Sequence, residues 1–164
     1  MKYDKKKYAE HLSGMVKFPT VSNVDPDKLP TEEFLKMHKY LEEIYPLVHK
    51  HLTKEVMGKC GLVFHWKGTG KSDKLPILFC AHQDVVPEGD HSKWKYPPFS
   101  GTVAEEKVWG RGTLDTKGGL WAMLQAAEEL AEAGYVPMHD VYFFSACTEE
   151  SDGSGADLVS TVLQ

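Results

Sequence analysis

Residues 117–146 read KGGLWAMLQAAEELAEAGYVPMHDVYFFSA, and this stretch decides the fold. Apolar residues recur at intervals of three and four along its first half, which predicts a one-faced helix over residues 117–133. Gly134 stands where a left-handed C-cap belongs, and residues 141–146 form a compact apolar run typical of a buried strand. A similar run over 76–81 precedes the helix. Strand, helix and strand in this order predict an α/β fold with a right-handed crossover and a mostly parallel sheet flanked by helices.

The upstream sequence predicts two further helices. The first covers residues 4–16 and ends before the Phe18-Pro19 junction, because a residue that precedes proline disfavours the helical region. The second begins near Thr31 as N-cap and is ended or kinked at Pro46. The remaining expected elements are a loop over 19–30, short strands over 52–57 and 62–66, a long loop over 87–101, and a last helix that Asp152 or Ser154 caps and that carries Ala156, Val159, Val162 and Leu163.

Length and composition exclude several classes of protein. A chain of 164 residues, 26% of them charged, is typical of one globular domain with at most a small second piece. Its net charge of −5 disfavours nucleic acid as a partner. No apolar run approaches the roughly 20 residues of a membrane span, and no apolar segment follows the basic start as in a signal peptide. The three cysteines lack CxxC spacing, so a disulfide framework is disfavoured and a cytoplasmic location is expected.

Acidic and imidazole residues follow both apolar runs. His82 and Asp84 come after the strand over 76–81, and Glu149 and Glu150 come after the strand over 141–146. Asp115 lies between them in a turn whose glycines at 110, 112, 118 and 119 allow a tight backbone. Ligands of α/β proteins collect beyond the carboxyl ends of parallel strands. We therefore expect the five side chains to meet at one edge of the sheet.

These residue types suit a divalent metal ion. Imidazole and carboxylate ligands favour zinc or a similar ion. In an extended chain His82 and Asp84 share a face, so Asp84 can hydrogen-bond the ring nitrogen of His82 that does not bind metal. Glu149 and Glu150 then point to opposite sides, which lets one bind metal while the other acts as a base. Alone, each feature also fits a surface pair, a solvated face or an anion-binding turn; together they favour a site.

Other motifs are interpreted as structural. Gly70-Lys71-Ser72 lacks the first glycine of a phosphate loop, because His65 occupies that position, and this weakens a nucleotide-binding function. Cys80 and Cys147 lie in apolar runs and are expected to be inert buried thiols. The aromatic residues of the long loop are expected to cover the sheet edge or to line a site; they are Trp94, Tyr96 and Phe99.

Four segments together carry a family pattern. They are His82-Gln83-Asp84-Val85-Val86-Pro87, Trp94 with Pro97-Pro98-Phe99-Ser100-Gly101, the run from Trp109 to Gly118, and Thr148-Glu149-Glu150. This combination resembles the M20 family of metallopeptidases, and residues 81–118 most resemble its carboxypeptidase S (Gly-Xaa carboxypeptidase) branch. The resemblance implies a zinc-exopeptidase-like catalytic domain, of which residues 1–164 are the N-terminal part. The rest of this domain and a lid domain would lie outside the chain. The whole enzyme would form a homodimer through the lid domain.

The resemblance also implies a chemistry: hydrolysis of the amide bond of a peptide or N-acyl amino acid. His82 would bind one of two divalent ions, Asp115 would bridge both and Glu150 would bind the second. Asp84 would orient His82, and Glu149 would be the general base for a water that bridges the ions and would later protonate the leaving amine. Zn²⁺ is the expected ion, with Co²⁺ or Mn²⁺ as alternatives. A cis peptide bond between Asp115 and Thr116 is a further expectation.

Members of that family use two more ligands, a further acidic residue and a histidine near the distant C-terminus, which this sequence does not contain. Each ion would then keep only two ligands, so the chain alone is expected to bind metal weakly and to be inactive. The apolar pattern that runs into Gln164 favours the front piece of a longer protein over a natural ragged end. The alternative function is a non-catalytic isolated domain or binding module derived from such an enzyme.

Overall fold

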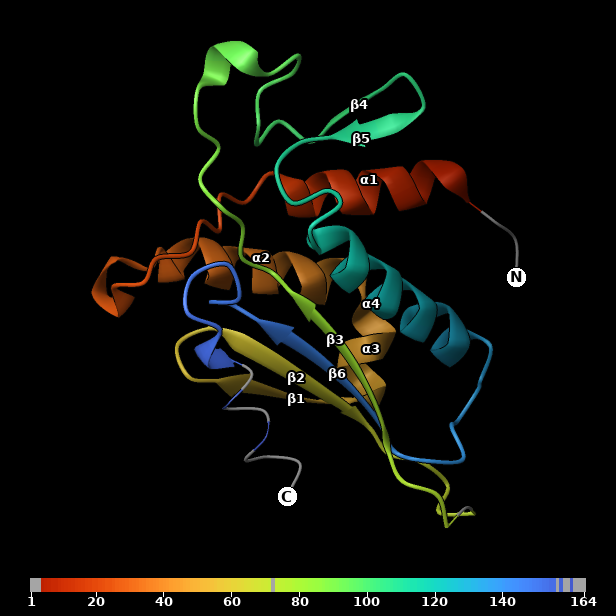
Figure 1. Cartoon of the computed structure of the whole chain (residues 1–164). Coiled ribbons are helices and arrows are strands. Elements are labelled where there is room, and N and C mark those ends of the chain that lie inside the picture. Colours follow the sequence, from red (N-terminus) through yellow and green to blue (C-terminus); the bar gives the residue numbers. More distant parts are fainter. Residues whose placement is uncertain (1–3, 72, 156, 158–159, 161–164) are drawn as a thin grey trace.

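The computed structural model describes residues 4–71, 73–155, 157 and 160 (Figure 1). Its α-helices are α1 (Lys5–Val16), α2 (Thr31–Ile44), α3 (Pro46–His51) and α4 (Lys117–Glu132). Its strands are β1 (Thr53–Met57), β2 (Gly61–Trp66), β3 (Ile77–His82), β4 (Thr102–Ala104), β5 (Lys107–Trp109) and β6 (Val141–Ala146). Within these ranges, no helix is both long and apolar enough to cross a bilayer.

The main sheet has the strand order β1-β2-β6-β3 and is mixed. The crossover through α4 makes β3 and β6 parallel, as expected, whereas β1–β2 and β2–β6 are antiparallel. The α/β class is confirmed, but the described sheet is mixed rather than mostly parallel, because the β1–β2 hairpin lies antiparallel on β6. The largest core cluster packs side chains of α1, α2, α3 and α4 against residues of β2 and β6.

Several local expectations differ from the structure. Thr31 is the first residue of α2 rather than its N-cap, and Pro46 begins α3, since proline is well suited to the first position of a helix. The short hairpin β4–β5 was not predicted, because its sequence shows no clear alternation of apolar and polar residues. The run over 77–80 is exposed rather than covered on both faces, because β3 is an edge strand of the described sheet. The described residues at the start of the predicted last helix, Ser154 and Gly155, are helical, and the N–H of Ser154 donates to Oδ1 of Asp152. The apolar residues predicted for this helix lie outside the described residues; they are Ala156, Val159, Val162 and Leu163.

A buried carboxylate links two of the helices. Glu128 of α4 accepts hydrogen bonds from the backbone N–H groups of Leu47 at 3.0 Å and Val48 at 2.7 Å. These groups belong to the first turn of α3, where N–H groups lack partners within the helix and the helix dipole favours a negative charge. Glu128 therefore fixes the start of α3 against α4.

We expect Glu128→Gln to lower the free energy of unfolding by about 1–2 kcal/mol, because an amide is a weaker and uncharged acceptor for these N–H groups. Urea unfolding measures this difference. The matched control is Glu132→Gln on the exposed side of the same helix, for which a change within about 0.5 kcal/mol is expected. Equal effects of the two substitutions would contradict the capping role.

A second buried polar residue lies between two candidate site residues. The Gln83 side chain donates to the carbonyl oxygens of Cys60 at 2.7 Å and Ser145 at 3.3 Å, and its amide oxygen lies 2.8 Å from Nε2 of His38. Gln83 thus connects β3 to the ends of β2 and β6 and to α2. Burial is the main cause that lowers the pKa of His38 below its ordinary 6.5.

The lowered pKa of His38 predicts acid sensitivity. The unfolded chain takes up the proton of His38 at a higher pH than the folded chain, so stability is lost as the pH falls below 6.5. Glutamine does not titrate, so we expect the variant His38→Gln to lose less free energy of unfolding than the wild type between about pH 7 and pH 5. Urea unfolding over this range measures it. His51→Gln, at an exposed histidine, should leave the wild-type pH dependence unchanged; an unaltered slope in His38→Gln would refute the assignment.

Candidate metal centre

The carboxyl ends of β3 and β6 place the site. Their parallel register runs from Ile77 opposite Val141 to His82 opposite Ala146. The N–H of Gln83 extends this pairing by donating to the carbonyl oxygen of Ala146 at 2.9 Å. In Figure 1 the loops after β3 and β6 and the turn before α4 lie toward the same end of the sheet. Residues far apart in sequence therefore reach one edge, as the strand pattern predicts.

His82 is the central side chain of the site and is nearly buried. Its Nδ1 lies 3.0 Å from the main-chain carbonyl oxygen of Asp84, which can only accept, so Nδ1 carries the proton. Its Nε2 faces the Asp115 carboxylate at 3.1 Å and the Glu149 carboxylate at 3.6 Å. Burial opposes a charge on the ring, but the carboxylate and main-chain oxygen of Asp84, with the charge of Glu149, outweigh it and raise the pKa of His82 to about 9.

Asp84 is fully buried and supports two parts of the site. Its Oδ2 accepts the N–H of Glu150 at 2.9 Å, which holds the loop after β6 against the loop after β3. Its Oδ1 lies 3.5 Å from Nδ1 of His82 and has no hydrogen-bond partner among the described residues. The main-chain oxygen of Asp84 is thus nearer to the His82 ring than its carboxylate, which the sequence pattern did not indicate.

Glu149 and Glu150 point to the same side. One ligand atom each of His82, Glu149 and Glu150 lie within 4.8 Å of one another. The expectation of opposite directions is wrong because the chain turns here: the N–H groups of Ser151, Asp152 and Gly153 all bond to the carbonyl oxygen of Thr148. Burial and the charges of neighbouring carboxylates, Asp115 first among them, raise the pKa of Glu150.

Asp115 is held by a tightly packed turn. The peptide bond between Asp115 and Thr116 is cis, which confirms that expectation. Gly112 has a φ of +84°, and a Cβ there would lie 2.7 Å from Val85. A Cβ on Gly118 would lie 2.3 Å from the carbonyl oxygen of Thr113. These two positions require glycine, and the exposed Asp115 carboxylate is left directed toward His82.

Sequence reasoning missed Lys117, which lies two residues after Asp115. Its side chain is fully buried, and its ammonium donates to the carbonyl oxygens of Phe18 at 2.6 Å and Met15 at 3.3 Å. Met15 lies in the last turn of α1, where carbonyl groups lack partners within the helix, and Phe18 lies two residues beyond its end. Burial lowers the pKa of Lys117 to about 7, against the attraction of Asp84. A lysine at the start of a helix whose first two turns are otherwise apolar was the available signal.

A cavity of about 690 Å³ opens beside Asp115 and Glu150 and is also lined by Trp94, Trp109 and Arg111. The Arg111 guanidinium lies 4.9 Å from the ring centre of Trp94, and one of its N–H groups reaches the carbonyl oxygen of Pro87 at 3.3 Å. Trp94 therefore lines the candidate site, one of the two positions expected for it. Tyr96 packs against Trp109 with ring centres 5.3 Å apart.

The chain is similar to known proteins in sequence and in fold. Residues 78–163 match the model of "Peptidase family M20/M25/M40". The chain is 39% identical to carboxypeptidase S of Saccharomyces cerevisiae over 164 residues, and this match covers 94% of the chain and 28% of the relative. It is 35% identical to the human N-fatty-acyl-amino acid synthase/hydrolase PM20D1, covering 94% of the chain and 31% of the relative.

Solved structures share the fold. An M20 family metallo-carboxypeptidase from Sulfolobus solfataricus matches with a TM-score of 0.67 and 24% identity, over 87% of this chain and 31% of its own. Human carnosine dipeptidase 1 matches with a TM-score of 0.73 and 17% identity, over 96% of this chain and 35% of its own. The chain thus spans between 28% and 35% of the length of these four proteins. Its sequence and fold make it a member of peptidase family M20/M25/M40.

Proposed function

We propose that this chain supplies metal-binding and proton-transfer residues to a hydrolase that cleaves the amide bond of a peptide or N-acyl amino acid. The observation that carries the proposal is the convergence of His82, Glu149 and Glu150, with Asp115 3.1 Å from His82, at the carboxyl edge of the sheet. Two relatives, a carboxypeptidase and an N-fatty-acyl-amino acid synthase/hydrolase, support this substrate class by their names.

The residues fit a divalent cation. Carboxylates of Asp84, Asp115, Glu149 and Glu150 surround one imidazole, and their mutual repulsion contributes to the raised pKa of Glu150. The buried Oδ1 of Asp84 has no hydrogen-bond partner within the described ranges, so the charge of Asp84 is incompletely compensated there. One imidazole with several carboxylates is a donor set that suits Zn²⁺, with Co²⁺ or Mn²⁺ as alternatives.

In this proposal, Nε2 of His82 would hold one ion, Glu150 would hold a second ion, and Asp115 would be a ligand of both. When bound, the ions supply Lewis-acid polarisation of the amide carbonyl and lower the pKa of water. Asp84 positions both His82 and the backbone of Glu150. Glu149 takes up a proton at its carboxylate and delivers it to the leaving amine. The neighbouring cavity, with Trp94 and Arg111 on its wall, is where we place the substrate.

Two ligands for each ion are fewer than the three protein ligands of an ordinary catalytic zinc site. We therefore expect the 164-residue chain to bind Zn²⁺ weakly and to show no turnover of an N-acyl amino acid. A chimera in which the chain replaces the matching segment of yeast carboxypeptidase S should bind two ions tightly and turn over. Calorimetric titration and a hydrolysis assay on both proteins measure this. Tight binding of two ions with full turnover by the short chain alone would contradict the expectation.

Variants of the chimera separate the roles. Glu149→Gln should lower turnover by about 10²–10⁴-fold with two ions still bound, since the amide cannot accept the proton. His82→Ala should lose tight binding of one ion. Glu132→Gln, at an exposed glutamate of α4, is the control and should change neither quantity. Unchanged turnover in Glu149→Gln would refute the general-base role, and unchanged metal stoichiometry in His82→Ala would refute the ligand role.

A further inference from the structure

Cys60 and Cys147 lie at the ends of two paired strands. Cys60 immediately precedes β2 and Cys147 immediately follows β6. These strands are antiparallel, with Leu62 opposite Ser145 as the pair nearest this end. Continuing the same register by two residues places Cys60 directly opposite Cys147. Opposed residues of antiparallel strands have Cα atoms about 4.5–5.5 Å apart, within the roughly 4.4–6.8 Å that a disulfide bond spans.

The side chains confirm that the two residues are neighbours. Both belong to one buried apolar cluster with Leu29 and Phe34. A hydrogen bond between the two thiols is the main cause that raises the pKa of Cys60 and lowers that of Cys147. The amide of Gln83 donates to the carbonyl oxygens of both Cys60 and Ser145, which holds the ends of β2 and β6 together.

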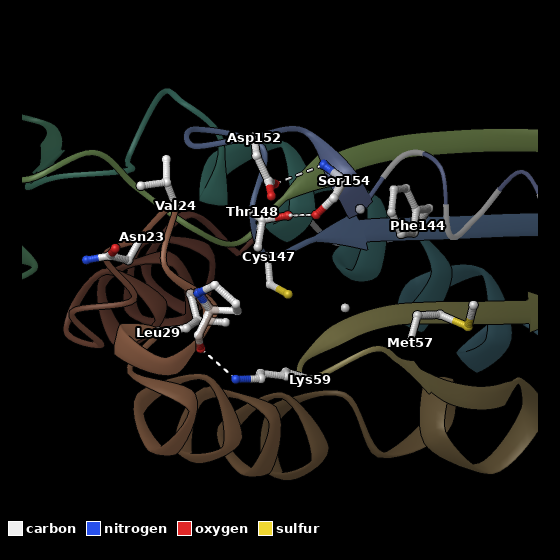
Figure 2. A pocket seen from close by; sticks show the side chains of 13 residues that line it. Asn23, Val24, Leu29, Met57, Lys59, Phe144, Cys147, Thr148, Asp152 and Ser154 are labelled. Carbon is white, nitrogen blue, oxygen red and sulfur yellow. Dashed lines mark hydrogen bonds between the residues drawn. The ribbon is translucent and has the colours of Figure 1, made fainter.

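One of the two sulfur atoms can be reached by a small molecule. Figure 2 shows the Cys147 side chain directed into a cavity between Leu29 and Met57. The cavity has a volume of about 140 Å³, several times the roughly 30 Å³ that a water molecule occupies in the liquid. Cys147 lines this cavity, whereas Cys60 is fully buried and is not one of its lining residues. A hydroperoxide therefore meets Cys147 first.

We propose that Cys60 and Cys147 form a reversible disulfide site, distinct from the metal cluster. The Cys147 thiolate attacks a hydroperoxide such as hydrogen peroxide: an S–O bond forms, the O–O bond breaks and hydroxide leaves. The sulfur of Cys60 then attacks the sulfenic acid, so that the S–S bond forms, the S–O bond breaks and a second hydroxide leaves. Protons, including those of the two thiols, convert both hydroxides to water. The thiols lose two electrons and the peroxide gains them.

The bond would act on the loop that carries the acidic residues. Cys147 begins the segment that continues to Glu149 and Glu150, and Cys60 ends the turn between β1 and β2. A disulfide would tie this segment covalently to that turn. It also closes a long loop of chain, so the oxidised protein should resist unfolding more than the reduced protein.

The experiment oxidises the reduced 164-residue chain with hydrogen peroxide in the presence of a chelator, so that metal chemistry plays no part. Intact mass should fall by two hydrogen atoms, and the number of alkylatable thiols should fall from three to one. Peptide mapping should find Cys60 linked to Cys147. The melting temperature should rise, and dithiothreitol should reverse all three changes.

Cys80→Ser removes the exposed thiol of β3 and is the matched control; it should form the same cross-link. Cys60→Ser should abolish it, with Cys60→Ala as a second variant and circular dichroism to establish that each is folded. A bond that involves Cys80, a disulfide only between molecules, or stepwise oxidation of Cys147 with Cys60 still free would overturn the proposal. None of these readouts depends on hydrolysis, so the disulfide site and the proposed function fail independently.

Discussion

The parallel pairing of β3 with β6 is the constraint on which the candidate site depends. It places His82 opposite Ala146, so the loops that follow the two strands begin at the same edge of the sheet. A shift of the register by one residue would turn every side chain of one strand to the other face. His82 would then point away from Glu149 and Glu150. The crossover helix α4 completes the arrangement, because the turn that carries Asp115 leads directly into it.

Three buried polar residues hold the loops of this edge in place. Gln83 contacts the ends of β2 and β6, Asp84 binds the backbone of Glu150, and Lys117 binds carbonyl groups at the end of α1. Burying a polar group without a hydrogen-bond partner costs free energy, so each of these contacts favours one position of the loop that it holds. The side chains of Asp115 and Glu149 are by contrast mostly exposed. A ligand site requires a backbone that is held in place and side chains that a ligand can reach, and this edge of the sheet has both.

The sequence predicted what depends on local periodicity and missed what depends on distant partners. The bounds of α2, α4 and β6 follow from apolar spacing, proline and glycine, and strand-end residues were enough to bring His82 and Glu150 to one edge. An apolar run does not reveal which strands lie beside it, so the exposure of β3 and of Cys80 was not predicted. The proximity of Cys60 to Cys147 is likewise a matter of register between segments far apart in the chain.

Charge explains why this edge suits a cation. Nearly buried His82 lies against the carboxylates of Asp84, Asp115 and Glu149. The charge of Asp84 also acts on the buried ammonium of Lys117. Lys117 is turned toward backbone carbonyls at the end of α1, which leaves His82 as the group in contact with the acidic cluster. One imidazole cannot neutralise several carboxylates. Burial, together with this excess of negative charge, raises the pKa of Glu150. A divalent ion, as proposed above, would reduce this repulsion, and the buried contacts of Gln83, Asp84 and Lys117 already hold the loops that carry the carboxylates.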